Sequence, residues 1–265
     1  MKSYEILDSE SKKNVGVLIY YEKKKDFIIE LSEDLDEWTA PLLFCNLVKR
    51  NIYTVPRDLS LLWVKERIIP AGRQNIGMIL KNHKLETYDE MKFLEISKGK
   101  CSQDSLYIKK SDCLPLYVTD RAQRNITECI PCEDGKLLCF FVCGIIKKID
   151  IKDVISPDEA RKITKNETLF NSCEVGTGGY FVSFDNAIDI SARVLYESGL
   201  NIPLTREDFI GFAQRNLPDT SECCNLMGCS RQNISYMIKN KQLKEVKSNV
   251  KGNLYMKGDV LSTTW

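Results

Sequence analysis

The spacing of hydrophobic and polar positions predicts an α+β arrangement for residues 1–125. Two apolar runs, Gly16–Tyr21 and Asp26–Leu31, are joined by four charged residues, which is the pattern of a β-hairpin. Apolar positions then recur at intervals of three and four, so helices are expected over three further segments. These segments are Pro41–Asn51, Gln74–Lys81 and Tyr88–Ser97, the last of which ends before Gly99.

In residues 126–203 the apolar positions form short runs, which is the pattern of short paired strands. Lys136–Val142 is strongly apolar, and Ile145–Ile151 alternates apolar and charged positions on the other side of Gly144. Two such runs across a glycine predict an antiparallel pair. The other expected elements are a polar helix at Pro157–Asn166, a strand pair at Phe181–Phe184 and Ala187–Ile190, and a short helix at Ser191–Ser198. A second small α+β module is therefore predicted.

The order of these elements carries a family resemblance. The stretch Tyr180–Ser191 reads YFVSFDNAIDIS and is soon followed by LYESG at Leu195–Gly199. Together with the preceding hairpin, residues 126–202 resemble the DUF2442 domain of bacterial proteins, a family of unknown function. Some members carry this domain fused to a DNA-binding helix-turn-helix. The resemblance implies a binding or dimerising module and supplies no catalytic residues.

Residues 204–265 contain the pattern of two helices joined by a sharp turn. Asp219 or Thr220 can cap the first helix, and Gly228 can end it in the left-handed conformation that glycine adopts at little cost. Ser230 is a strong N-cap for the second helix. The side chains expected to face inward are Cys223, Cys224, Met227, Cys229, Ile234, Met237 and Ile238. This spacing predicts a helix-turn-helix.

The basic residues are concentrated where this helix-turn-helix is predicted. The net charge of the chain is only +1, yet seven basic residues and one acidic residue lie between Gly228 and Lys257, a local charge of +6. Such a distribution is typical of a modular nucleic-acid-binding protein, although a solvated lysine-rich segment is the alternative interpretation. The residues predicted to contact DNA are Thr220, Ser230, Arg231, Gln232, Asn233, Ser235, Tyr236, Lys239, Lys241, Lys244, Lys247 and Lys251.

A basic hairpin is expected after the second helix. Gln242–Val246 and Asn253–Met256 are strand-like, and Lys247–Gly252 forms the expected tip between them. The residues that carry a family match are Thr220–Glu222, Leu226, Gly228, Ser230–Gln232, Ile234, Leu243–Val246, Leu254–Met256, Asp259 and Val260. Over this span the chain resembles the excisionase and MerR-like winged helix-turn-helix family. The resemblance implies that Ser230–Lys239 reads the major groove and that the hairpin lysines contact phosphates, the alternative being a degenerate unit used only for protein contact.

Length and composition fit a multidomain globular chain. The 265 residues, 43% apolar and 28% charged, suffice for two small α+β modules followed by a C-terminal winged helix-turn-helix. No apolar run approaches the ~18 residues of a membrane-spanning helix. The N-terminus is polar and lacks the features of a secretory signal. We therefore expect a cytoplasmic protein that does not bind membranes.

Eleven cysteines in a chain expected to be cytosolic indicate free thiols, metal ligands or redox groups. Cys129 and Cys132 form a CxxC pair, the weak candidates for metal binding, and Cys139 and Cys143 follow. Cys139 and Cys143 are expected within one strand, roughly 13 Å apart, so they cannot both converge on one ion. Zinc binding, a redox pair and plain buried cysteines stay open, and the last is favoured.

No other motif indicates catalysis. His83, the single histidine, is interpreted as a surface residue at a helix end. Gly176–Gly179 precedes a strand, whereas phosphate-binding loops precede a helix, so it is interpreted as a turn. Arginines such as Arg67, Arg73 and Arg121 form either an anion-binding surface or, in the favoured interpretation, structural ion pairs.

The sequence thus predicts a non-enzymatic DNA-binding protein, a transcriptional regulator that needs no cofactor. Its expected partner is double-stranded DNA, bound by a homodimer, with residues 1–203 serving dimerisation or contact with a partner protein. One alternative is a small enzyme or toxin-like effector in residues 1–125, which a deep polar pocket there would favour. The other alternative is a thiol- or zinc-dependent sensor.

Overall fold

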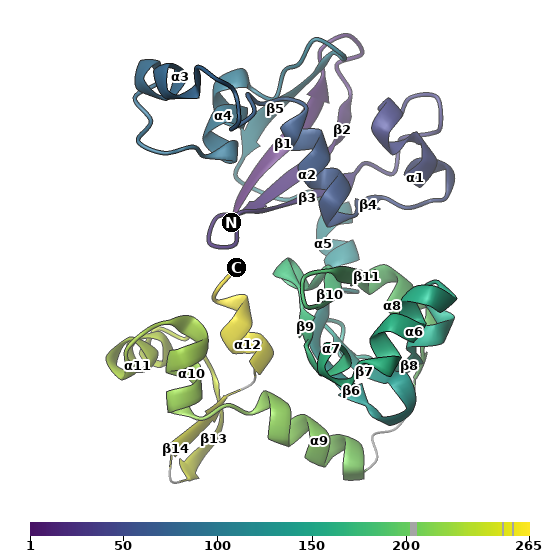
Figure 1. The fold of residues 1–265 in the computed structure, drawn as a ribbon, viewed down its shortest axis with the longest axis vertical. Helices are drawn as coiled ribbons and strands as arrows, with labels where there is room; N and C mark the ends of the chain where they lie inside the picture. Colours follow the sequence, from purple (N-terminus) through teal and green to yellow (C-terminus); the bar gives the residue numbers. More distant parts are fainter. Residues whose placement is uncertain (202–205, 251, 256) are drawn as a thin grey trace. The chain divides into compact units, whose positions relative to one another are not determined.

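The computed structural model describes residues 1–201, 206–250, 252–255 and 257–265. The chain divides into two compact units, Met1–Thr119 and Asp120–Trp265. Helices and small antiparallel sheets alternate along the described residues, so the predicted α+β class is confirmed (Figure 1). The domain boundary predicted near residue 203 falls in residues 202–205, outside the described residues, and a separate third domain stays a prediction.

The first unit is built on a five-stranded antiparallel sheet in the order β4-β3-β2-β1-β5. Its strands are β1 (Lys2–Asp8), β2 (Asn14–Tyr21), β3 (Asp26–Leu31), β4 (Thr54–Val55) and β5 (Leu106–Ser111). The predicted hairpin is confirmed, since β2 and β3 pair from Gly16 opposite Leu31 to Tyr21 opposite Asp26. Sequence patterns did not predict β1, whose second partner, β5, comes from a distant segment.

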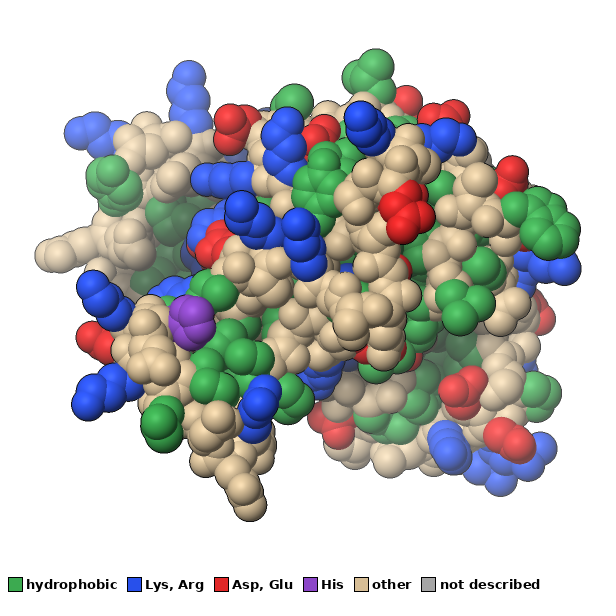
Figure 2. Space-filling view, turned by 90° about the horizontal axis from the view of Figure 1, so that it is seen from above, with side chains coloured by type: hydrophobic (Ala, Val, Ile, Leu, Met, Phe, Trp, Pro, Cys, Tyr) green, Lys and Arg blue, Asp and Glu red, His purple; other side chains and the backbone are tan. Residues whose placement is uncertain are grey.

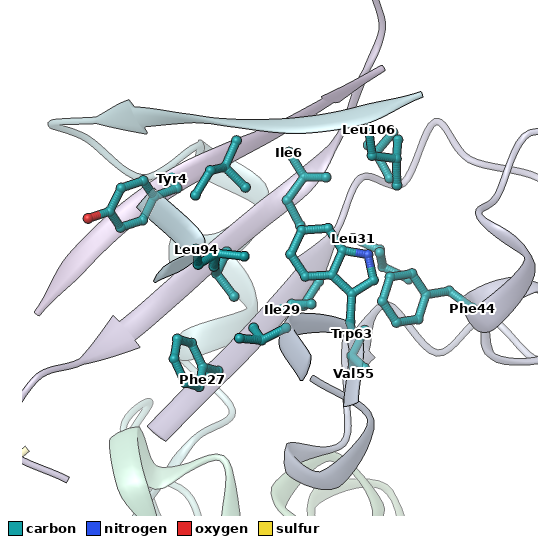
Figure 3. Close-up of a cluster of buried hydrophobic side chains, with 14 of the residues drawn as sticks. Tyr4, Ile6, Phe27, Ile29, Leu31, Phe44, Val55, Trp63, Leu94 and Leu106 are labelled. Carbon is teal, nitrogen blue, oxygen red and sulfur yellow. The ribbon is translucent and has the colours of Figure 1, made fainter. Parts of the chain in front are cut away.

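Helices cover this sheet and complete its core. The helical elements are η1 (Leu42–Phe44), α1 (Cys45–Lys49), α2 (Arg57–Lys65), α3 (Ile76–Asn82), α4 (Glu90–Ser97) and α5 (Leu116–Ala122), which crosses the boundary between the units. α2 was not predicted; it packs on β3, and its Trp63 lies at the centre of the cluster in Figure 3. No residue of α3 is buried. α4 begins at the Asp89 cap and ends with Lys98 and Gly99 in the left-handed conformation.

Arg67 is a buried arginine of the first unit. Arg67 is only 5% exposed, its guanidinium carbon lies 3.8 Å from the centroid of the Trp63 ring, and it pairs with Asp104. Burial lowers the pKa of Arg67, and Asp104 partly offsets this effect. For this residue the interpretation as a structural ion pair is confirmed.

Two sheets form the centre of the second unit, in the orders β12-β8-β7-β6 and β11-β10-β9. The strands are β6 (Ile126–Cys132), β7 (Lys136–Phe141), β8 (Ile146–Asp150), β9 (Cys173–Val175), β10 (Phe181–Phe184), β11 (Ile188–Ser191) and β12 (Leu200–Asn201). The two predicted strand pairs, β7 with β8 and β10 with β11, are confirmed. Asp185 and Asn186 connect the second pair, each with a φ of 53°, which is the left-handed geometry of a tight hairpin turn.

Short helical elements surround these sheets. They are η2 (Glu133–Gly135), η3 (Ile151–Asp153), α6 (Pro157–Lys165), α7 (Glu167–Asn171), η4 (Thr177–Gly179) and α8 (Ala192–Ser198). α6 and α8 occupy predicted segments. The glycine-rich segment, which contains η4, makes a turn as predicted, and it packs on the start of β6. Asn125 donates a hydrogen bond to the Gly178 carbonyl oxygen. A Cβ on Gly179 would lie 2.3 Å from the Ile126 carbonyl oxygen, so the close approach requires glycine there.

The cysteines of the CxxC pair do not form a joint site. The Cys129 sulfur lies 3.7 Å from that of Cys139 and 3.4 Å from that of Cys173, within the buried core, whereas Cys132 belongs to a different cluster. The contact with Cys139 and burial raise the pKa of Cys129 well above the usual value, although the contact with Cys173 lowers it, and the contact with Cys129 and burial raise the pKa of Cys173. Neither environment favours a thiolate. Cys143 is exposed in the turn after β7, which ends at Phe141, so the strand predicted to hold both Cys139 and Cys143 is wrong.

α9 (Arg206–Asn216) leads from the central sheets to the C-terminal elements. It packs on β6, and the ring centroid of Phe212 lies 4.9 Å from that of Phe140. Its Asp208 carboxylate pairs with Lys148 Nζ at 2.9 Å. The elements that follow are α10 (Thr220–Met227), α11 (Arg231–Lys239), β13 (Glu245–Val250), β14 (Gly252–Tyr255) and α12 (Lys257–Ser262).

Candidate nucleic-acid interface

α10 and α11 are capped at the residues that the sequence predicts. The Asp219 carboxylate accepts a hydrogen bond from the Glu222 backbone N–H, and the Glu222 carboxylate accepts one from the Asp219 N–H, which makes a capping box. Gly228, with a φ of 62°, ends α10 in the left-handed conformation. The Ser230 hydroxyl oxygen accepts from the Asn233 N–H at the start of α11. These bonds fix the sharp turn between the two helices.

A small hydrophobic core lies beneath the two helices. Its buried members are Cys223, Ile234, Leu243, Tyr255 and Val260, and its partly buried members are Cys224, Met227, Cys229, Met237 and Ile238. Every side chain predicted to face inward belongs to this cluster. Leu243, Tyr255 and Val260 follow the helices in sequence, so the core also holds the hairpin and α12 in place.

The outward face of α11 is exposed along its length. Its exposed side chains are Arg231, Gln232, Asn233, Ser235, Tyr236 and Lys239, and Lys241 and Lys244 are exposed after it. Tyr236 is 62% exposed, a high value for an aromatic side chain. Among the described residues no salt bridge neutralises Arg231 or Lys239. Thr220, at the first position of α10, is only partly exposed.

Arg231 is oriented by the neighbouring helix. Its Nη2 donates a hydrogen bond to the Ser221 Oγ of α10 at 2.9 Å. A guanidinium has five N–H donors, so this contact leaves others for an acceptor in solution. Sequence reasoning did not assign Ser221 this positioning role, because a spacing of ten residues across a turn has no periodic signal.

The strands of the hairpin after α11 have different bounds from those predicted. β13 continues to Val250 and β14 begins at Gly252, so the predicted tip over Lys247–Gly252 is wrong. Backbone pairing continues through this polar stretch, with Val250 opposite Gly252, and irregularities in the register absorb the extra residues. The side chain of Lys247 and the whole of Lys251 lie outside the described residues, and their phosphate contacts stay predictions.

α12 connects this region to the central sheet of the second unit. Glu128 of β6 is 4% exposed, and its carboxylate accepts a hydrogen bond from the backbone N–H of Gly258. Burial raises the pKa of Glu128 to about 7; the bond from Gly258 and the charge of Lys257 lower it, and Asp259 raises it further. The C-terminal elements are therefore attached to β6 through both α9 and α12.

Other residues considered in the sequence analysis lie outside this region. His83 is exposed, in agreement with its interpretation as a surface residue, and Figure 2 shows a histidine at the surface among interspersed basic and acidic side chains. Within the described residues, no group of three or more histidine, cysteine, aspartate or glutamate side chains is arranged to hold a metal ion. No described helix is long and apolar enough to cross a membrane.

No family model, curated protein or solved structure matches this chain. The resemblances to the DUF2442 and the excisionase and MerR-like families therefore stay predictions that rest on the residues quoted for them.

Proposed function

We propose that the C-terminal residues, from Asp219 to Val260, form a winged helix-turn-helix that binds double-stranded DNA sequence-specifically, and that the protein regulates transcription. In this proposal α11 enters the major groove, and Arg231, Gln232 and Asn233 contact base edges from its first turn. The exposed Lys241 and Lys244 contact backbone phosphates.

The observation that carries the proposal is the contrast between the two faces of α11. Ile234 is 1% exposed and anchors the helix to its core, whereas the opposite face presents amide, guanidinium, hydroxyl and ammonium groups to solvent. These are the groups that hydrogen-bond to base edges and phosphates. Arg231, Gln232 and Asn233 lie in the first turn of α11, where the backbone N–H groups of the helix N-terminus also favour an anion.

The attachment of this region supports a regulatory role. α9 and α12 both contact β6, so a change in the central sheet can reach the two helices through packed elements rather than through a free linker. Small DNA-binding units of this kind gain affinity by pairing on a palindrome, and we therefore include a homodimer in the proposal.

Selection of binding sites from random duplexes by the full chain, read by sequencing, tests the proposal. We expect an enriched motif with two related half-sites about one helical turn apart, which reports both specificity and pairing. The variant Arg231→Ala/Lys239→Ala should lose the enrichment. The control Lys162→Ala/Lys165→Ala removes the same charge from exposed positions on α6 and should keep it. Absence of any enriched motif with the wild type would contradict the proposal.

A further inference from the structure

The first unit contains a small pocket between one edge of the β2–β3 hairpin and the start of α4. Its volume is about 170 Å³, and it is lined by Tyr20, Lys25, Phe27, Tyr88, Asp89 and Glu90. Pockets for drug-sized ligands measure ~300–1,000 Å³, so this one accepts only a small group. Its lining combines three aromatic rings with two carboxylates.

The aromatic walls are fixed in place by the fold. Tyr20 and Phe27 face each other across the hairpin, with stacked rings whose centroids are 4.8 Å apart, and both are buried. Tyr88 donates its hydroxyl hydrogen to the Ile69 carbonyl oxygen at 2.7 Å, which holds its ring at the pocket. Figure 3 shows Phe27 at one end of the core cluster. Aromatic faces carry partial negative charge and attract cations.

The electrostatic surroundings of the pocket are acidic. Asp89 caps α4 through the Lys92 N–H and Glu90 occupies the first turn, where both carboxylates also face the positive end of the helix. Burial raises the pKa of Tyr20 to about 12, and the charges of Asp89, Glu22, Glu90 and Glu95 add to this shift. Lys25 supplies a positive charge in the lining, at an exposed turn position with a φ of 57°.

We propose that this pocket binds the methylated ammonium group of a small molecule, with the cation against the Tyr20, Phe27 and Tyr88 rings and its charge balanced by Asp89 and Glu90. A quaternary ammonium is weakly hydrated and suits apolar aromatic walls, whereas an anion would meet two carboxylates. The site is separate from α11, so its failure would leave the proposed DNA binding unaffected.

Calorimetric titration of the full chain with tetramethylammonium chloride tests the proposal, with sodium chloride at matched ionic strength as the blank. Uncharged tert-butanol, of similar shape, is the ligand control. We expect saturable binding of tetramethylammonium and of choline but not of tert-butanol. An equal response to tert-butanol, or no saturable response to tetramethylammonium, would overturn the proposal.

Three variants separate the charge contribution from folding. Glu90→Gln should weaken tetramethylammonium binding by about fivefold, since one facing charge is lost. Lys25→Asn should tighten it, because it removes a repelling charge while asparagine tolerates the left-handed backbone. Tyr88→Phe keeps the ring but loses the hydrogen bond to Ile69 that holds it, so it should weaken binding less than Glu90→Gln does. Equal affinities for Glu90→Gln and Lys25→Asn would contradict the assignment even if all three proteins fold.

Discussion

The backbone amide of Gly258 donates a hydrogen bond to the buried carboxylate of Glu128, 130 positions earlier in the chain. The approach is so close that a Cβ on Gly258 would lie 2.2 Å from the Thr127 carbonyl oxygen and 2.6 Å from Glu128 Oε1. α12 can therefore begin against β6 only because this residue has no side chain. Through this contact the C-terminal elements are joined to the centre of the second unit.

Gly258→Ala should separate α12 from β6. Its methyl group meets backbone atoms that cannot move away cheaply, so we expect a loss of about 1–3 kcal/mol in the free energy of unfolding. Urea denaturation followed by circular dichroism measures it. The matched control is Gly211→Ala in α9, where a Cβ meets nothing within 4 Å and the helix gains up to about 1 kcal/mol. Destabilisation by both variants alike would contradict the close contact at Gly258.

Glu128 should make stability depend on pH. Burial raises its pKa from 4.5 to about 7 in the folded chain. Its stabilising contribution is therefore fully present below the unfolded value and is lost as the pH rises through the folded value. The loss is on the order of 3 kcal/mol at most.

Glu128→Gln retains an acceptor oxygen for Gly258 but cannot ionise. We expect it to match the wild type at about pH 4 and to be the more stable protein at about pH 8. Urea unfolding of both proteins across this range is the measurement. The same difference in stability at both ends of the range would show that Glu128 is not the titrating group.

Local signals predicted many of the elements, but not the long-range contacts between them. The β2–β3 hairpin and the caps at Asp219 and Ser230 are encoded within a few neighbouring residues, so pattern and capping chemistry sufficed. β1 completes its sheet with β5, which comes from a distant segment, and its own sequence does not alternate clearly. The contact of Glu128 with Gly258 has no local signal, because it depends on how α12 meets the sheet.

The Ser230 cap should stabilise α11 locally. Ser230→Ala removes the acceptor for the Asn233 N–H and should cost about 1 kcal/mol. Faster hydrogen exchange at the amides of the first turn of α11 would report the loss. Ser235→Ala is the control within the same helix: its hydroxyl only donates to the Arg231 carbonyl, and alanine is a better helix former. Exchange that is unchanged in Ser230→Ala would argue against the cap.

The pair of Arg67 with Asp104 should stabilise the first unit. Asp104→Asn leaves the guanidinium buried without its counter-charge, and because Asp104 is 31% exposed we expect a loss of about 1–3 kcal/mol, below the range for fully buried pairs. Fluorescence of the adjacent Trp63 during urea unfolding measures it. The control is Glu66→Gln. Glu66 lies 3.9 Å from Arg67 and is 37% exposed, so this variant should lower the free energy of unfolding by less than about 0.5 kcal/mol. Equal losses of stability in Asp104→Asn and Glu66→Gln would contradict the stabilising role of the pair of Arg67 with Asp104.

At the candidate interface, the sequence predicted which residues of α11 are exposed, but it did not predict the contacts that hold them in position. The outward positions follow from helical periodicity once Ile234 and Ile238 are assigned to the core. The hydrogen bond from Arg231 to Ser221 depends on how α11 packs on α10, and the predicted hairpin tip was wrong because backbone pairing continues through that polar stretch.

The salt dependence of DNA affinity tests the central claim most directly. The dissociation constant of the full chain for its selected duplex, measured by fluorescence anisotropy over a range of salt concentrations, should rise steeply with salt. Arg231→Ala/Lys239→Ala should weaken binding and lower the slope of the logarithmic plot by about two units, because two cations no longer release counterions. Binding that is insensitive to salt, or equal affinity and slope for the wild type and this variant, would contradict DNA recognition by α11.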